Sequence, residues 1–461
     1  MILVGLLGGY LTLLLGGLGV ALLVTRGEPR LNIIEYCCLA WLFGTGVVSL
    51  LLWICGTFIP GIALQAIVAI ACVFLGFVGW RVKQRAAAQF ILPIPRGFVE
   101  WLLASCVVAE IATLLFASCK HSLGWDGLLN WEIKARYAFM NDGVIPASYY
   151  SDSGRAFSHP EYPLGIPFTE LWLYLWMGQA NQFWVKTIFP LFYAAGSLLL
   201  ALLGSRISGQ RWSGLLVAAL VPFIPYFVTG PGGVFVAYAD IPLNVFYLAA
   251  LGYLIYSLDH NGTSMSMYAG CSTLLPWIKR EGLILWLVLA LLGLVVSLRG
   301  KKLQPFLLSL LPGLFVTVSW QIYLAVRHAV PSSDFSGLTV RTLHENMDRI
   351  VPICRALVRE MADLSHWSIF WLLAGFGLFY LLVRVRNMRS YLLTSAILMP
   401  IILYCITYLF SEWPSYTAHI TSSLPRLLLH IVSAAWLAVA LVLPFSLKVK
   451  RKHVTSFSLN N

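Results

Sequence analysis

Long apolar runs, separated by short polar connections, make up most of this chain. A helix needs about 20 apolar residues to cross a bilayer, and many of the runs approach or exceed that length. We delimit about thirteen segments: 1–24, 33–57, 61–80, 97–118, 183–204, 213–228, 241–258, 264–278, 282–298, 305–326, 366–383, 391–410 and 427–446. The pattern predicts an all-α fold, a polytopic membrane helical bundle of about thirteen transmembrane helices.

Composition and charge agree with a membrane protein. The chain is 59% hydrophobic and only 11% charged, whereas soluble domains carry about 25% charged residues. The basic residues behind the formal charge of +12 follow alternate apolar segments and fill the tail. They are Arg26, Arg30, Arg81, Lys83, Arg85, Arg96, Arg206, Arg211, Arg299, Lys301, Lys302, Arg384, Arg386, Arg389, Lys448, Lys450, Arg451 and Lys452. The positive-inside rule then predicts an outer N-terminus and a cytoplasmic C-terminus. Because cytoplasmic loops account for the positive charge, we expect no nucleic-acid partner.

The longest polar interruption, 119–182, lies on the predicted outer side. Its part 125–164 is dense in ionisable side chains, which suggests a site working at the membrane surface. The run IPFTELWLYLWM that follows is apolar but short, and a spanning helix there would invert the orientation of all later segments. We predict a helix lying in the membrane interface, with Trp172, Tyr174 and Trp176 as interfacial aromatic residues.

Two aspartates stand out where apolar segments meet the outer side. Asp126 follows the fourth segment, where partial desolvation would raise its pKa and make it a better base. The alternative is that it caps a short surface helix from Gly127 to Met140. Asp240, in YADIPLN at the start of the seventh segment, has the same two interpretations: a helix cap, or a second functional carboxylate that holds a metal or an acceptor or serves as the base.

Positive groups suited to phosphate lie on the same predicted side. Lys279, Arg280 and Glu281 interrupt two apolar segments, so they belong at the outer interface or along a cavity. The Lys–Arg pair there suits a phosphate, although a plain turn between helices would also tolerate it. Arg426 and His430 are four residues apart and share one helix face. Arg426 is a candidate clamp for an anionic head group that His430 assists, and snorkelling of Arg426 is the alternative.

The outer loop supplies further candidates for binding an acceptor or substrate. Glu132 and Lys134 fall on the expected 127–140 helix, where Glu132 and Arg136 also form an i,i+4 surface pair. His159, Glu161 and Tyr162 belong to the rigid HPEYPL segment before the interfacial helix. With Glu281, these residues complete the candidate substrate site: Glu132, Lys134, His159, Glu161, Tyr162 and Glu281. The chain contains no P-loop, HExxH, GxSxG or CxxC…CxxC pattern, which disfavours a nucleotide-linked donor.

Taken together, these motifs resemble the multi-spanning glycosyltransferases of the GT-C superfamily, in particular bacterial relatives of the aminoarabinose and protein mannosyl transferases. The resemblance covers about residues 97–446. It rests on the order of WDGLLNWEIKARYAF, HPEYPLGIPFTELWLYLWMG, YADIPLNVFYLAALGYL, IKREGLILWLVLALLGL and SLPRLLLHI. We accordingly divide the chain into an N-terminal three-helix membrane extension (1–96), a GT-C-like transmembrane catalytic core (97–446) and a basic cytoplasmic tail (447–461).

The resemblance implies a polyprenyl-phosphate-linked sugar donor and a site on the outer face of a bacterial plasma (inner) membrane. It also implies an essential carboxylate in the first outer loop, which matches Asp126, and a second acidic position, which matches Asp240. Many family members have paired acids at the second position, but here alanine and isoleucine flank Asp240. This departure puts metal binding in doubt, so no cofactor is certain and a divalent cation (Mg or Mn) on Asp126 and Asp240 stays open.

Together these expectations predict an enzyme, an inverting glycosyltransferase that depends on a polyprenyl-phosphate sugar. Asp126 would act as general base on a glycan, lipid or protein acceptor, Asp240 would orient the acceptor or a cation, and Lys279, Arg280 and Arg426 would neutralise the leaving phosphate. The alternatives are a flippase or transporter for a lipid-linked sugar and a polysaccharide polymerase or ligase. The second alternative would use the late outer loop 327–365.

Overall fold

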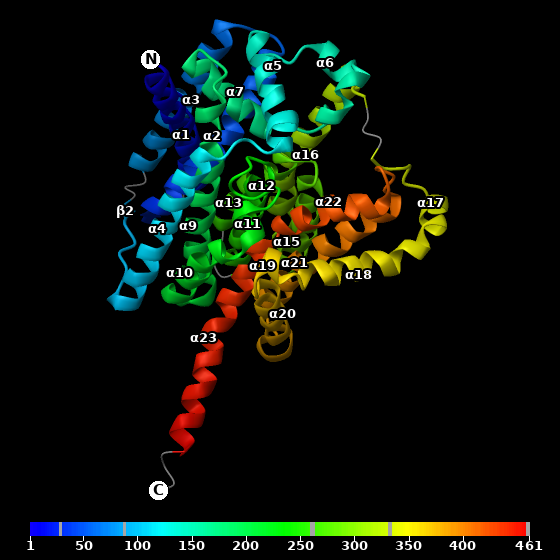
Figure 1. The fold of residues 1–461 in the computed structure, drawn as a ribbon. Coiled ribbons are helices and arrows are strands. Elements are labelled where there is room, and N and C mark those ends of the chain that lie inside the picture. The colour runs from blue at the N-terminus through cyan, green and yellow to red at the C-terminus, as the bar shows by residue number, and fades with distance from the viewer. Residues whose placement is uncertain (27–29, 86–88, 259–262, 331–333, 458–461) are drawn as a thin grey trace.

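The computed structural model describes residues 1–26, 30–85, 89–258, 263–330 and 334–457. In these residues the chain is a helical bundle (Figure 1). Two strands of three residues each form a small sheet beside the helices. The first half comprises α1 (Ile2–Val24), β1 (Arg30–Asn32), α2 (Ile33–Gly56), α3 (Ile62–Arg85), β2 (Gln89–Ile91), α4 (Gly97–Lys120), η1 (Gly127–Glu132), α5 (Ile133–Met140), α6 (Ala147–Ser151), η2 (Ser153–Ser158), α7 (Gly165–Met177), α8 (Gln182–Val185), α9 (Ile188–Ser208), α10 (Arg211–Leu220), η3 (Val221–Phe223), α11 (Pro225–Thr229) and α12 (Asp240–Tyr256).

The second half is helical throughout its described elements. It comprises α13 (Thr263–Thr273), α14 (Leu275–Ile278), α15 (Gly282–Arg299), α16 (Leu303–Val326), α17 (Val340–Glu345), η4 (Met347–Arg349), α18 (Ile350–Met361), α19 (Leu364–Trp367), α20 (Phe370–Tyr380), η5 (Leu381–Val385), α21 (Met388–Thr407), η6 (Tyr408–Phe410), α22 (Tyr416–Leu429) and α23 (Val432–Phe457). Strands β1 and β2 pair in parallel, with Arg30 opposite Gln89 and Asn32 opposite Ile91.

The described residues contain eight helices that are long and apolar enough to cross a membrane, or nine if the bent pair α22 and α23 forms one span. The chain is therefore an apolar membrane-type bundle. Each of the thirteen predicted segments falls on helix, but several are short or broken, as in α13 with α14 and α10 with α11. The count of thirteen spans and their orientation stay predictions.

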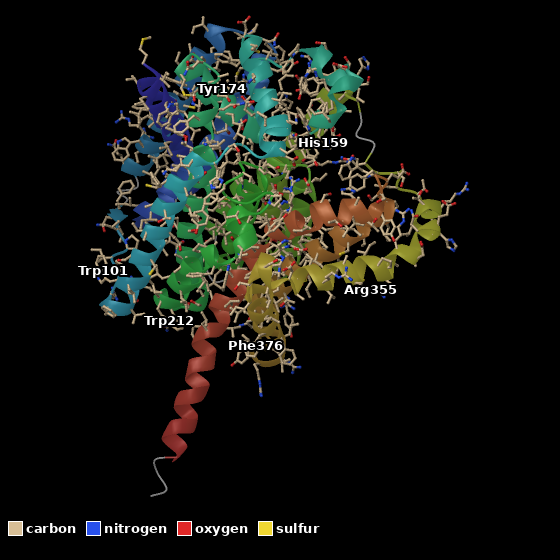
Figure 2. The ribbon with its side chains drawn as sticks, viewed as in Figure 1. Trp101, His159, Tyr174, Trp212, Arg355 and Phe376 are labelled. Atoms are coloured by element: carbon tan, nitrogen blue, oxygen red, sulfur yellow. The ribbon has the colours of Figure 1, made fainter. Side chains whose placement is uncertain are left out.

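The molecule has two distinct ends. In Figure 1 the N-terminus, α5, α6 and α7 lie at the upper end, and α23 runs down to the C-terminus at the opposite end. Side chains labelled in Figure 2 follow the same division, because His159 and Tyr174 lie toward the upper end and Trp212 and Phe376 toward the lower one. Helix α23 continues to Phe457, and the last four residues of the predicted tail 447–461 lie outside the described residues.

Of the first three helices, α1 and α2 pack onto later helices of the bundle, and α3 packs on α1 and α2. Helix α2 is largely buried against α1, α7 and α9. Both terminal guanidinium nitrogens of Arg206 on α9 donate to the buried carboxylate of Glu35 on α2, at 2.6 and 2.5 Å. Tyr253 on α12 donates to the same carboxylate at 2.8 Å. This buried ion pair joins the predicted extension 1–96 to the predicted core.

Helix α7 forms where the sequence predicts a short helix, but its environment differs from the prediction. Trp172 and Tyr174 are fully buried inside the protein instead of facing the membrane interface, and Trp176 is partly buried. Trp172 Nε1 donates to the carbonyl oxygen of Gly9 on α1 at 2.9 Å. The interfacial interpretation is therefore wrong for these two aromatic residues, because α7 packs against α1, α2 and α5 and is enclosed by them.

Candidate functional site

Three interruptions of helical structure meet around Asp240. Helix α12 begins at this residue, with Pro242 in its first turn, where a missing N–H is tolerated. The chain breaks between α14 and α15 at residues 279–281. It breaks again between α22 and α23, whose axes are bent by 46°. Each interruption leaves polar backbone and places ionisable side chains inside an otherwise apolar bundle.

Asp240 is fully buried and contacts three positive or potentially positive side chains. Lys279 Nζ lies 2.9 Å from Oδ1, and His430 Nε2 lies 2.9 Å from the same oxygen. Arg426 donates to Oδ2 at 3.2 Å. Asp240 lies in the first turn of α12, directly after the N-cap residue Ala239, so it is placed to interact favourably with the helix dipole, as the capping interpretation expects. Its role in the fold is to neutralise and hold these side chains.

Arg426 bridges the two aspartates that the sequence singles out. One terminal nitrogen lies 2.7 Å from Asp126 Oδ2, and the other lies 3.2 Å from Asp240 Oδ2. The guanidinium also lies over the ring of Tyr238, 4.8 Å from its centroid. Its Nε is buried and has no hydrogen-bond partner among the described residues. Two segments more than a hundred residues apart thus place both carboxylates on one cation.

The turn around Asp126 depends on two glycines. Gly124 donates its N–H to the carbonyl oxygen of Val236 at 3.0 Å, and a Cβ on Gly127 would lie 2.7 Å from that same oxygen. Because glycine has no Cβ, the start of η1 can approach the segment that leads into Asp240. The predicted helix from Gly127 to Met140 is present as η1, a π-helical turn, followed by α5. Asp126 precedes it without a side-chain capping bond.

The two aspartates differ in exposure. The side chain of Asp126 is 24% exposed, whereas that of Asp240 is 0% exposed. Among the described residues, Asp126 has one ion-pair partner, Arg426, which contacts Oδ2. Its Oδ1 therefore remains available to a ligand. Of the two carboxylates, Asp126 is the one that a substrate can reach.

The break between α14 and α15 supplies a second carboxylate beside Lys279. Lys279 Nζ lies 3.0 Å from Glu281 Oε1 as well as 2.9 Å from Asp240. Burial alone would raise the pKa of Glu281, but Lys279 and His430 hold it below its ordinary value. Lys279 is thus shared between two carboxylates, as Arg426 is, and its role in phosphate binding stays a prediction.

The HPEYPL segment lies beside this cluster. Arg280 approaches Glu161 at 3.6 Å, and His159 approaches Glu161 at 3.6 Å and Asp334 at 3.7 Å. Burial would raise the pKa of Glu161, but His159 and Lys134 lower it. His159 also stacks on Tyr162, with ring centroids 5.0 Å apart. The predicted substrate residues of this segment therefore form one contact group around Glu161.

Glu132, the last residue of η1, and Lys134, on α5, have different surroundings. Lys134 is buried, donates to Asn130 Oδ1 at 2.8 Å and lies over the ring of Tyr162. The expected i,i+4 pair of Glu132 and Arg136 is present, but Glu132 is buried and does not lie at the surface. It accepts from Arg136 at 3.0 Å and from Tyr174 at 2.8 Å. These contacts give Glu132 a packing role, and its part in substrate binding stays a prediction.

Sequence reasoning missed several members of the site. Tyr404 on α21 contacts His430 Nδ1 at 3.1 Å, and no sequence signal marks it within its apolar segment. Asp334 comes from the predicted late loop 327–365, whose residues 331–333 lie outside the described residues. Gly232 packs against the Asp240 carboxylate with a φ of +91°. Tyr238 is two residues before Asp240, so the YADIP motif itself could have pointed to it.

A divalent cation on Asp126 and Asp240 fits this arrangement poorly. Both oxygens of Asp240 face Lys279, His430 or Arg426, and Arg426 also contacts Asp126. These positive groups oppose a metal ion between the aspartates. The described residues contain no group of three or more His, Cys, Asp or Glu side chains placed to hold a metal. We therefore assign no chemical step to a cation.

Comparisons with protein-family models, with curated proteins and with solved structures found no match. The functional argument accordingly rests on the residues and contacts of this chain.

Proposed function

We propose that the protein is a glycosyltransferase that moves a sugar from a polyprenyl-phosphate-linked donor to an acceptor hydroxyl of a glycan, lipid or protein. The observation that carries the proposal is the Arg426 bridge between a reachable carboxylate, Asp126, and a buried one, Asp240. Such a cluster places a base and a phosphate-binding cation side by side in an apolar bundle. The GT-C-like order of motifs along the sequence supports the same conclusion.

The different exposure and charge contacts of Asp126 and Asp240 suggest different catalytic roles. Asp126 accepts the proton of the acceptor hydroxyl as the hydroxyl oxygen attacks the anomeric carbon. The bond from that carbon to the phosphate oxygen breaks, and the electron pair leaves with the lipid phosphate. Attack opposite the leaving group inverts the anomeric centre. Asp240 is buried behind Arg426, so it positions Arg426 and Lys279 and does not act as the base.

The leaving phosphate needs positive charge that is present before the reaction. Arg426 is the proposed source of this charge, because Asp126 and Asp240 hold its two terminal nitrogens in place beside the reachable carboxylate. Arg280 is half exposed and extends the positive surface toward Glu161. Apolar helices around the cluster suit a lipid tail, and a lipid-linked donor needs no soluble nucleotide. The outer face of a bacterial inner membrane is the proposed location.

The test is transfer by the purified full-length protein in detergent, from a panel of radiolabelled polyprenyl-phosphate sugars to extracted acceptors. We expect Asp126→Asn to fold and to lose transfer by a factor of about 10²–10⁴, the usual contribution of a general base. Asp142→Asn is the matched control, because Asp142 is an exposed aspartate of the same outer loop and asparagine tolerates its positive φ of 54°. Full activity of a folded Asp126→Asn protein would refute the assignment.

A polymerase or ligase is the second candidate, because the late loop reaches the site. Asp334 lies 3.7 Å from His159, and the N–H of Glu412 donates to the carbonyl oxygen of Asp334 at 2.9 Å. The products of the same assay distinguish the two candidates. A single added sugar supports the monosaccharide transferase, and products extended by several repeating units support the polymerase.

A further inference from the structure

A large cavity lies between α1, α2, α13, α15 and α16, away from the aspartate cluster. Its volume is about 1310 Å³, above the roughly 300–1,000 Å³ of ordinary small-molecule sites. Most of its lining is apolar, for example Phe43, Leu50 and Phe306. Leu308, which lines the cavity, is 57% exposed and belongs to α16, one of the candidate membrane spans. The cavity therefore borders the surface that would face membrane lipid.

The basic residues of this cavity gather near one end. Arg26, Arg299 and Lys302 belong to the lining, and all three are exposed. None of the described lining residues is acidic. Ser297, one turn from this end of α15, is buried, and its hydroxyl has no hydrogen-bond partner in the described part of the chain. An apolar cavity with a basic end matches a ligand with an anionic head and an apolar tail.

The basic end is opposite to the aspartate cluster along the helices. Helix α12 begins at Asp240, and the cavity contacts Ser257 just past its other end. Helix α15 begins after Glu281 and ends at Arg299. At 1.5 Å per residue these helices separate the two sites by about 25 Å. The basic end of the cavity is therefore distinct from the proposed transferase site, while the apolar lining extends to Leu274, the residue before α14.

We propose that this cavity binds an anionic phospholipid, with its phosphate at Arg26 and Arg299 and its acyl chains along α2, α13 and α16. Basic pockets between membrane helices are suited to anionic lipid head groups, which are abundant on the cytoplasmic leaflet. The charge pattern of the sequence assigns this end to that leaflet. The inference does not depend on the proposed transferase activity.

The experiment is lipid binding to the full-length protein by native mass spectrometry, with dioleoyl phosphatidylglycerol, dioleoyl phosphatidylcholine and undecaprenyl phosphate as separate probes. We expect the phosphatidylglycerol affinity to fall about fivefold for each basic side chain removed, and thus about 25-fold in Arg26→Gln/Arg299→Gln. Affinity for phosphatidylcholine should not change in that variant. Arg384→Gln is the matched control, because Arg384 is an exposed arginine on the same predicted side and outside the cavity lining.

A second variant tests the cavity itself. Ala269 lines it without being fully buried, so Ala269→Phe should reduce binding of both phospholipids by filling the space while the basic end stays intact. Equal affinity for the two phospholipids, or an unchanged phosphatidylglycerol affinity in the double variant, would overturn the proposal. Dependence on Arg26 and Arg299 for undecaprenyl phosphate alone would likewise reject a phospholipid as the occupant.

Discussion

Lys279 and Asp240 form a buried ion pair, with Nζ 2.9 Å from Oδ1 and side chains 3% and 0% exposed. The lysine comes from the break between α14 and α15, and the aspartate comes from the first turn of α12. The pair therefore explains why the chain interrupts two apolar helices at residues 279–281. On an uninterrupted helix the Lys279 ammonium would not lie beside the Asp240 carboxylate, or it would lie in the hydrocarbon of the membrane.

Substitution of one partner of this ion pair should destabilise the protein more than substitution of both. Asp240→Asn leaves Lys279 buried with less compensation, and we expect a loss of about 3–5 kcal/mol in the free energy of unfolding. Asp240→Asn/Lys279→Met removes both charges and should recover about 0.5–3 kcal/mol of coupling energy. Denaturant unfolding in detergent measures both values. Strictly additive losses in the double variant would contradict the coupling.

The bridge between the aspartates requires an arginine. A lysine at position 426 has one ammonium and cannot contact Asp126 and Asp240 with separate nitrogens. We expect Arg426→Lys to lower the stability by about 1.5–3 kcal/mol, the value of one hydrogen bond to a charged group.

Arg341→Lys provides the control for this substitution. Its ion pair with Glu345 has a distance of 2.7 Å, but the two side chains are 87% and 56% exposed. We expect a change of at most about 1 kcal/mol there. Thermal unfolding of both variants checks the contrast, and equal shifts would indicate that Arg426 contacts a single carboxylate.

Alanine substitutions at Gly232 and Gly209 can distinguish the effect of backbone strain from the effect of contact with the site. Both have positive φ, +91° and +71°. A Cβ on Gly232 would lie 3.1 Å from the carboxylate of Asp240, whereas a Cβ on Gly209 would have no heavy atom within 4 Å. Alanine at either position should cost about 1–3 kcal/mol for the backbone conformation. Gly232→Ala should cost about 1–3 kcal/mol more for overpacking, and it alone should reduce transfer. Equal effects of the two variants on transfer would show that Gly232 does not support Asp240.

Lys134 should make the stability depend on pH. Burial lowers its pKa from 10.5 to about 7, and nearby Glu161 and Asp126 offset only part of this effect. Between these values the unfolded chain binds more protons than the folded one, so stability should rise with pH from about 7 to 10.5. The slope should approach 1.4 kcal/mol per pH unit at most, since one pKa unit corresponds to about 1.36 kcal/mol.

Lys134→Met should remove this contribution while keeping a side chain of similar length. Unfolding midpoints measured at several pH values between 7 and 9.5 compare the variant with the wild type. Lys120→Met is a suitable control, because Lys120 is an exposed lysine at the end of α4. An identical pH slope in wild type and Lys134→Met would contradict the lowered pKa of Lys134.

The candidate site shows how far motifs along the chain predict contacts. Four residues each lie where an apolar segment meets polar residues, and the structure brings them together: Asp126, Asp240, Lys279 and Arg426. The sequence does not predict Tyr404, since a tyrosine within an apolar helix has no distinguishing pattern. Its role is visible only through its contact with His430.

The sequence alone determined the membrane class, the helical segments and the positions of the polar breaks, because burial in lipid requires long apolar helices and makes every exception visible. Tertiary structure decided which breaks meet, which aspartate is exposed, and that α7 lies inside the protein. These features depend on packing between helices far apart in the chain. An apolar helix surface has the same composition whether it contacts lipid or another helix, so sequence pattern cannot distinguish the two.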